Sequence, residues 1–391
     1  MKTFKKILTI FGICVIAINV GIFAPRAEVA HAAVSVDVAN FAQLFCVISA
    51  NQLPTVSDSY TNTTNYFCGG TTIADNDIDI AITASFNFSN VNSIGNPVVL
   101  YIPTKNFTIH SADLSNPQII TRDPADTTVL LYVNGGSLTL ANIIIDGNGA
   151  NVQATEVMVA MSTGTLNITD GTVLRNNNRI ANYGGGAMTI SGGNFNMTGG
   201  LITDNRALGA GGISFGNNNS SLTAVISGGE IIGNTAYQAT GGGIRLGITT
   251  TNGNSFSVNV IGKTVIANNT AATNGGGIGG YDDPRLQPYL TVGPNVVFSG
   301  NTAATTARID PSDQSLYDTN ILATSFSLPA PFNGYNNYDI QYAGTLPTDI
   351  CQYNSSLWAD DTNCVKPTEP TLPPTEPVVP GAPNTGLFLL R

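Results

Sequence analysis

The sequence LITDNRALGAGGI (Leu201–Ile213) returns further along the chain as IIGNTAYQATGGGI (Ile231–Ile244) and again as VIANNTAATNGGGI (Val265–Ile278). Each copy opens with apolar residues, continues through an Asn and a run of small or polar residues, and ends in glycines followed by Ile. Self-similarity at such spacings is typical of repeat proteins, in which each short unit stacks on its neighbour. The pattern therefore indicates a stack of units rather than one globular core.

The repeat continues in both directions when the segments are aligned on the Asn that closes each one. An alternating apolar triplet opens each unit, and a short apolar run precedes the Asn. The triplets are Leu138–Leu140, Leu166–Ile168, Phe195–Met197, Ala224–Ile226, Val258–Val260 and Leu290–Val292. The closing residues are Asn148, Asn176, Asn205, Asn234, Asn268 and Asn301, at spacings of 28, 29, 29, 34 and 33 residues.

Strands this short cannot bury an apolar face alone, but they can when stacked in register about 4.8 Å apart around a filled interior. We therefore predict an all-β protein, a right-handed parallel β-helix over residues 71–345 with one turn per repeat. Asn tolerates a left-handed backbone at a corner, and the six asparagines are predicted to bond to one another along the axis. A propeller or a sandwich is the alternative, which the irregular spacing disfavours.

The N-terminal residues predict an export signal followed by a cap. Lys2, Lys5 and Lys6 precede an apolar run over Ile7–Phe23, and Ala30–Ala32 has the small-x-small cleavage pattern, so residues 1–32 are predicted to be removed. An uncleaved membrane anchor is the alternative. Residues 33–70 are then predicted to form a cap, in which an Asn and a Gln form a capping box and one helix covers the open end of the first turn. The residues on the expected buried face of that helix are Phe41, Leu44, Phe45 and Ile48.

Charge and cysteine content limit the function and the compartment. Without residues 1–32, 11 basic and 24 acidic residues remain, a net charge of −13, which disfavours nucleic acid and anionic membranes as partners. The cysteines that remain are Cys46, Cys68, Cys351 and Cys364. An even number in an exported chain predicts disulfides, and proximity in sequence favours Cys46–Cys68 and Cys351–Cys364, the second within a C-terminal segment of residues 346–365. Four free thiols are the alternative.

Two motifs support a resemblance to known surface proteins. Phe298-Ser-Gly-Asn301 and Gly241-Gly-Gly-Ile244 resemble the FxxN and GG[A/I] repeats of polymorphic outer-membrane proteins. The chain is also similar to β-helix adhesin-like wall proteins of Gram-positive bacteria and to the pectin-lyase-like β-helix type. The resemblance implies a β-helix displayed at a cell surface, and it says little about the ligand.

The last residues predict a spacer and an attachment signal. Residues 366–391 begin with a Pro- and Thr-rich segment, which favours an extended polyproline-like spacer. The motif Ala382-Pro383-Asn384-Thr385-Gly386 follows and resembles the LPxTG sorting signal, with Ala382 in place of Leu. The resemblance implies cleavage between Thr385 and Gly386 and linkage to the cell wall. We expect linkage if the natural chain continues past Arg391 and release into the medium if it does not.

Candidate catalytic and metal-binding residues are few. His110 is the single His outside the first 32 residues, so neither a His-based zinc site nor a Ser-His-Asp triad is expected. The alternating Asp75, Asp77 and Asp79 could hold Ca²⁺, although a solvated outer face explains them as well, and no cofactor is expected otherwise. The remaining acid and Arg clusters lie in expected loops, at Asp282, Asp283 and Arg285 and at Arg308, Asp310 and Asp313.

These observations favour a non-enzymatic, monomeric, extracellular protein, an adhesin that binds a glycan or a host or cell-surface protein. Tyr183, Tyr237 and Tyr281 recur beside the glycine clusters and could stack on sugar rings. Two alternatives remain open. The same fold hosts extracellular polysaccharide lyases and glycoside hydrolases, and a purely structural surface stalk would need no ligand.

Overall fold

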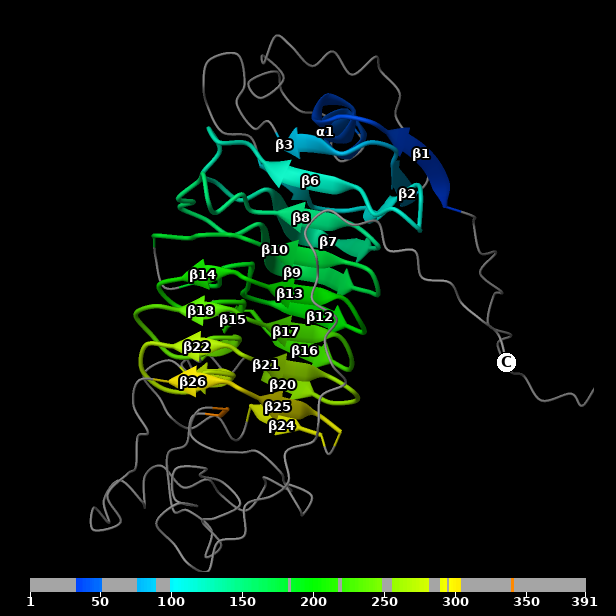
Figure 1. Cartoon of the computed structure of the whole chain (residues 1–391). Helices are drawn as coiled ribbons and strands as arrows, with labels where there is room; N and C mark the ends of the chain where they lie inside the picture. The colour runs from blue at the N-terminus through cyan, green and yellow to red at the C-terminus, as the bar shows by residue number, and fades with distance from the viewer. Residues whose placement is uncertain are drawn as a thin grey trace, which may run out of the picture. The chain divides into compact units, whose positions relative to one another are not determined.

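The computed structural model describes residues 33–50, 76–88, 99–181, 184–216, 220–247, 255–280, 289–293, 295–303 and 339–340. All of the described residues belong to the unit that begins at Ala33. These residues form a parallel β-solenoid, in which successive turns of the chain stack along one axis (Figure 1). The prediction of an all-β, parallel β-helix is therefore confirmed.

The largest sheet bends around one corner of the solenoid, so that it supplies two of its faces. Its central strands are long and cross the corner, whereas in later turns the same path is divided between two short strands. The strands of this sheet are β1 (Val34–Val38), β2 (Asp77–Ile82), β4 (Leu100–Ile102), β5 (Asn106–Ser111), β7 (Leu131–Ala141), β9 (Val159–Ile168), β11 (Met188–Ile190), β12 (Gly193–Met197), β15 (Ile213–Gly216), β16 (Leu222–Ile226), β19 (Ile244–Gly247), β20 (Phe256–Val260), β23 (Ile278–Gly280) and β24 (Leu290–Val292).

Two further sheets close the turn. The eight-stranded sheet contains β3 (Phe86–Phe88), β6 (Ile119–Arg122), β8 (Ile144–Asp146), β10 (Val173–Arg175), β13 (Leu201–Thr203), β17 (Glu230–Ile232), β21 (Val265–Ala267) and β25 (Val297–Ser299). The four-stranded sheet contains β14 (Arg206–Ala207), β18 (Thr235–Ala236), β22 (Thr270–Ala271) and β26 (Thr302–Ala303). Figure 1 shows β10, β13, β17, β21 and β25 one beneath another, with β14, β18, β22 and β26 beside them. Each turn therefore runs through strand, corner and short strand, as the repeat predicts.

The predicted apolar triplets fill the interior in register. The last residues of the six triplets pair from strand to strand and are at most 5% exposed: Leu140, Ile168, Met197, Ile226, Val260 and Val292. Full burial of such a side chain stabilises the fold by about 1.5–3 kcal/mol. Aromatic rings pack across the interior as well, with the centroids of Phe195 and Phe215 5.5 Å apart. The stack of interior columns is therefore the core of this solenoid.

The N-terminal helix forms where the sequence predicts it and packs on the first turn. Helix α1 spans Phe41–Ala50, and the backbone N–H of Gln43 donates to Asn40 Oδ1 over 3.0 Å, as expected of an N-cap. Its buried face contacts β1, β3 and β4, and the rings of Phe41 and Phe88 lie 4.6 Å apart. Strand β1 was not predicted: it pairs in parallel with β2, so this part of the cap belongs to the sheet itself. No helix in the described residues is long and apolar enough to cross a membrane.

Candidate functional site

A ladder of asparagine side chains runs along the corner between the eight-stranded and four-stranded sheets. Asn205 Nδ2 donates to Asn234 Oδ1 over 3.0 Å, and Asn234 Nδ2 donates to Asn269 Oδ1 over the same distance. Asn269 Nδ2 in turn donates to Asn301 Oδ1 over 3.1 Å. At the other end, Asn205 Oδ1 accepts from the backbone N–H of Asn177 over 3.0 Å. These side chains are nearly completely buried, so the ladder satisfies polar groups that water cannot reach.

The ladder corrects part of the predicted set. Asn205, Asn234 and Asn301 belong to it as predicted, but Asn177 and Asn269 take the places that we assigned to Asn176 and Asn268. The two displaced residues stand one position earlier, at the corner position that takes a left-handed backbone, with φ of 59° and 55°. Both positions of the corner suit Asn, for backbone reasons at the first and for hydrogen bonding at the second. In an Asn-Asn pair the sequence cannot distinguish the two roles.

Asn148 does not join the ladder. Its backbone also has a positive φ, of 55°, but its Nδ2 donates to the backbone carbonyl of Arg122 over 3.0 Å, and its N–H donates to Asp146 Oδ1 over 2.9 Å. Asn301 lies at the far end, where its Nδ2 donates to Asp339 Oδ1 over 2.8 Å. The ladder thus runs from Asn177 to Asn301. In the turn that contains Asn148, the Asn side chain bonds to the backbone of Arg122 and not to a ladder Asn.

A hollow of about 600 Å³ lies outside this corner, at the N-terminal end of the ladder. Its lining includes two acidic, two basic and four Asn residues. The lining residues are Ile119, Thr121, Asp146, Asn148, Gly149, Ala150, Arg175, Asn176, Asn177, Asn178, Asp204 and Arg206. Carboxylate, amide and guanidinium groups from three successive turns therefore face one open space. It is the candidate functional site of the described residues.

An ion pair within the hollow corrects a second prediction. The repeat alignment predicts that Arg175 stacks on Asp204, because each precedes its aligned Asn. In the structure Arg175 pairs in register with Asp146 on one side and Thr203 on the other. Arg175 Nε donates to Asp146 Oδ2 over 2.8 Å, and the same oxygen accepts from Asn176 Nδ2 over 3.0 Å. This prediction fails for the same reason as the prediction for Asn176. The alignment of Asn176 with Asn205 is shifted by one residue, so it places Arg175 beside Asp204 instead of Thr203.

A cation and an aromatic ring extend the hollow toward the four-stranded sheet. The guanidinium carbon of Arg206 lies 4.7 Å from the centroid of the Tyr237 ring, in a cation–π contact. Tyr237 Oη donates to the backbone carbonyl of Arg179 over 3.3 Å, which fixes the ring. Arg206 itself is exposed and forms no ion pair within the described part of the chain. The donors of Arg206 are therefore accessible to a bound molecule, whereas one face of its guanidinium is covered by Tyr237.

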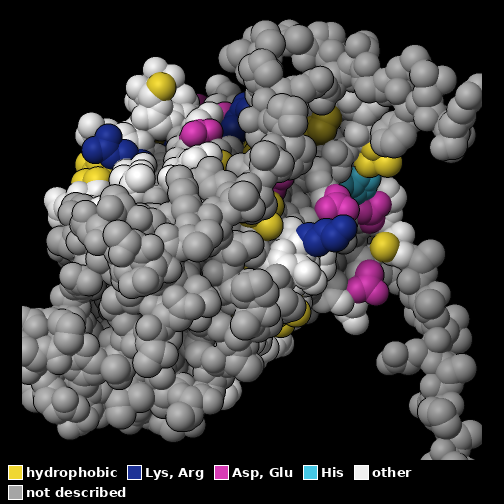
Figure 2. Space-filling view, turned by 60° about the horizontal axis from the view of Figure 1, so that its bottom comes forward, with side chains coloured by type: hydrophobic (Ala, Val, Ile, Leu, Met, Phe, Trp, Pro, Cys, Tyr) yellow, Lys and Arg dark blue, Asp and Glu magenta, His cyan; other side chains and the backbone are white. Residues whose placement is uncertain are grey.

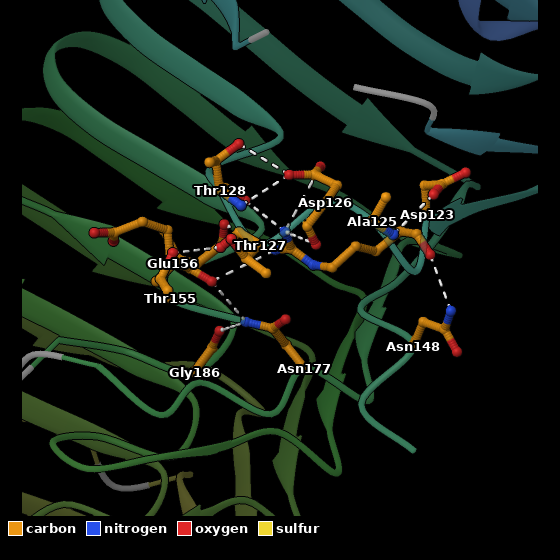
Figure 3. Close-up of polar contacts among 12 residues, drawn as sticks. Asp123, Ala125, Asp126, Thr127, Thr128, Asn148, Thr155, Glu156, Asn177 and Gly186 are labelled. Carbon is orange, nitrogen blue, oxygen red and sulfur yellow. Dashed lines mark hydrogen bonds and ion pairs between the residues drawn. The ribbon is translucent and has the colours of Figure 1, made fainter. Parts of the chain in front are cut away.

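Behind the hollow lies a buried network that the sequence reasoning missed (Figure 3). Arg122 is fully buried, and it donates to the backbone carbonyls of Thr128 and Val157 and lies 3.8 Å from Asp126 Oδ2. Asp126 Oδ1 accepts from the N–H and the hydroxyl of Thr128 over 2.8 and 2.9 Å. Burial lowers the pKa of Arg122 to about 10, although Asp126 and Glu156 oppose that shift. The available signal was that Arg122 alternates with the inward Ile120 on the short strand Ile119–Arg122.

The network connects the ladder to the next turns. Arg179 Nη2 donates to Glu156 Oε2 over 2.7 Å, and burial lowers the pKa of Arg179, an effect that Glu156 opposes. Asn177 Nδ2 donates to the backbone carbonyls of Gly186 and Glu156 over 2.6 and 3.2 Å, as Figure 3 shows. Arg122, Asn177 and Arg179 are at most 5% exposed, so this network supports the wall of the hollow from within the solenoid.

The acidic residues singled out near the first turns do not converge in the described part of the chain. Asp77 Oδ1 accepts from Asn106 Nδ2 over 2.7 Å, and Asp79 lies 3.1 Å from His110 Nε2, so the two carboxylates face different partners. No group of three His, Cys, Asp or Glu side chains that could hold a metal ion is present among the described residues. The expected Ca²⁺ partner Asp75 lies outside them.

Several predicted residues lie outside the described residues, so those predictions stay untested. Cys46 is half-buried on α1, but its predicted partner Cys68 and the pair Cys351 and Cys364 are not described. The same holds for the sorting-like motif Ala382–Gly386. It also holds for the remaining loop residues that we singled out, which are Tyr183, Tyr281, Asp282, Asp283, Arg285, Arg308, Asp310 and Asp313.

Comparisons with protein-family models, with curated proteins and with solved structures found no match to this chain. The fold and the hollow are thus the observations from which a function has to be argued.

Proposed function

We propose that this chain is an extracellular, non-enzymatic β-helix protein that binds a glycan in the corner hollow. The observation that supports this best is the lining of the hollow, in which Asp, Asn and Arg side chains from three turns converge. Carboxylates offer acceptors, guanidinium groups offer donors and amides offer both, so together they can pair with adjacent sugar hydroxyls. The Tyr237 ring beside Arg206 adds an aromatic surface at the edge of the site.

The balance of charge supports a neutral or weakly charged ligand. The hollow contains two acidic and two basic side chains, and one of each is already engaged in the Arg175–Asp146 ion pair. On the face drawn in Figure 2, acidic and basic side chains of the described residues lie beside one another rather than in a patch of one sign. A polyanion or polycation would find few complementary charges there.

A polysaccharide lyase or glycoside hydrolase is the second candidate, because two carboxylates line the hollow. Asp146 and Asp204 stand two turns apart along the axis, with Asp204 one residue past the position in register with Asp146. The strand spacing alone is about 9.6 Å, just beyond the roughly 6.5–9.5 Å between the carboxyl groups of inverting glycosidases. Asp146, however, already accepts hydrogen bonds from Arg175 and Asn176. We therefore favour binding over turnover. A stalk without any ligand is the remaining alternative.

The test is a glycan array on the chain from residue 33 onward, run beside reducing-sugar and 235-nm lyase assays. The double variant Asp146→Asn/Arg206→Ala should bind the selected glycan at least tenfold more weakly. Glu230→Gln should bind unchanged, since Glu230 is exposed on the same sheet but does not line the hollow. Turnover that Asp204→Asn abolishes would establish the enzyme instead, and the absence of any retained glycan would favour the stalk.

Attachment to the cell wall through Ala382–Gly386 is proposed together with the binding function. Pro383 would hold the peptide extended, and cleavage would fall between Thr385 and Gly386. Fractionation of cells that express the native gene tests this, with Thr385→Ala as the variant. Wall linkage that persists in Thr385→Ala would contradict the assignment.

A further inference from the structure

Five consecutive strands of the large sheet, from β7 to β20 along one side of the solenoid, present an ordered and uncharged outer surface. Along β7, β9, β12, β16 and β20, residues that point outward alternate with the buried triplet residues. Two outward residues from each strand make up this surface, which we call the polar face: Ser137, Thr139, Thr165, Asn167, Asn194, Asn196, Thr223, Val225, Ser257 and Asn259. Nine of these ten side chains are Ser, Thr or Asn, and none is charged.

The polar face is regular in two directions. Its members pair in register from turn to turn, so the rows lie about 4.8 Å apart and the two columns about 6.6 Å apart. Five rows therefore extend about 19 Å along the axis. Hydrogen bonds orient the amides along the column that contains Thr139, Asn167 and Asn196. Asn167 Nδ2 donates to Thr139 Oγ1 and Asn196 Nδ2 donates to Asn167 Oδ1, each over 3.0 Å. All ten residues are exposed or half-buried.

The chemistry of this surface selects the kind of ligand. A polyelectrolyte would find no opposite charge on it. A polymer with hydroxyl groups would find donors and acceptors at regular steps, and the Val225 side chain offers an apolar contact for C–H groups. A repeating ligand fits a repeating surface, because each turn of the solenoid then contributes a similar contact.

We propose that the polar face binds a neutral, extended polysaccharide lying across successive turns. Ordered water, as in an ice surface, is disfavoured because neighbouring rows differ in composition, from Thr165 and Asn167 to Thr223 and Val225. This binding surface is separate from the corner hollow: it lies on the large sheet, whereas the hollow lies on the eight-stranded sheet and at the corner beside it. Either site can fail without the other.

The experiment is sedimentation of the chain from residue 33 onward with particles of cellulose or chitin, and with immobilised polygalacturonate as the charged counterpart. We expect retention on at least one neutral solid and none on polygalacturonate. The double variant Asn194→Lys/Thr223→Lys places two charges at exposed positions of neighbouring turns and should weaken retention at least tenfold. The matched control Thr270→Lys/Thr302→Lys alters exposed positions of neighbouring turns on the four-stranded sheet and should bind as the parent does.

Thermal unfolding followed by circular dichroism verifies that both double variants are folded. Equal retention of the Asn194→Lys/Thr223→Lys variant and the parent would overturn the proposal, as would a failure of the parent to bind both cellulose and chitin. Inhibition of ice recrystallisation without retention on the solids would assign the face to ordered water instead. The hollow variant Asp146→Asn/Arg206→Ala should keep its retention on the solids, and its loss there would place that binding in the hollow.

Discussion

Replacing Asn205 with Leu is expected to lower the free energy of unfolding of the β-helix by about 3 kcal/mol. The side chain of Asn205 accepts from the buried N–H of Asn177 over 3.0 Å and donates to the carbonyls of Leu174 and Thr203 over 3.0 and 2.9 Å. It also donates to Asn234 Oδ1. Leu has a similar volume, so it leaves little cavity, but it can make none of these bonds.

The magnitude follows from the groups that lose their partners. A buried donor or acceptor left without a partner costs about 1–3 kcal/mol. The N–H of Asn177 is the clearest such group, and the carbonyl of Leu174 and Asn234 Oδ1 are each left with one bond fewer. At the lower end of that range, about 1 kcal/mol for each of the three groups, the loss is about 3 kcal/mol, or a fall of about 6–12 °C in melting temperature for a domain of this size.

The assay is equilibrium unfolding in urea, followed by far-UV circular dichroism, on the chain from residue 33 onward. The matched control is Asn259→Leu, the same chemical change at an outward position of β20, where the side chain bonds only to Ser257 Oγ among the described contacts. This control should change stability by no more than about 0.5 kcal/mol. Equal urea midpoints for Asn205→Leu and the parent would refute the role assigned to the ladder.

Three further substitutions test other parts of the fold. Arg122→Ala should cost about 3–5 kcal/mol in urea unfolding, because it removes the cation that faces Asp126, and Arg122→Met/Asp126→Leu should cost less than the single change; the reverse order would contradict a buried pair. Gly242→Ala should cost about 1–3 kcal/mol, because the new Cβ would lie 2.4 Å from a backbone oxygen of the next turn, whereas Gly216→Ala, with its nearest atom at 3.9 Å, should change the urea midpoint little. Asn40→Ala should cost about 1 kcal/mol in thermal unfolding through the lost N-cap bond, and an unchanged transition would argue against that cap.

The sequence alone determines the architecture of this protein, because the same pattern of apolar triplet, short apolar run and closing Asn occurs in each repeat. The triplets such as Phe195–Met197 and Val258–Val260 alternate with period two, and only stacked parallel strands can bury all of them at once. The signals for the helix Phe41–Ala50 are equally local, since its N-cap and its apolar face lie within about a dozen consecutive residues. Such features depend on neighbours in sequence, so sequence reasoning finds them.

The register of the corner and the composition of the hollow were decided only by the tertiary structure. Asn176 and Asn177 both suit a corner, and which of them points inward depends on the turn stacked above, not on either residue. The Arg175–Asp146 pair and the convergence of Arg206 follow from that register, because a shift of one residue changes the partner of every side chain along the strand. The repeat therefore specifies that the turns stack, whereas packing between turns specifies which side chains meet.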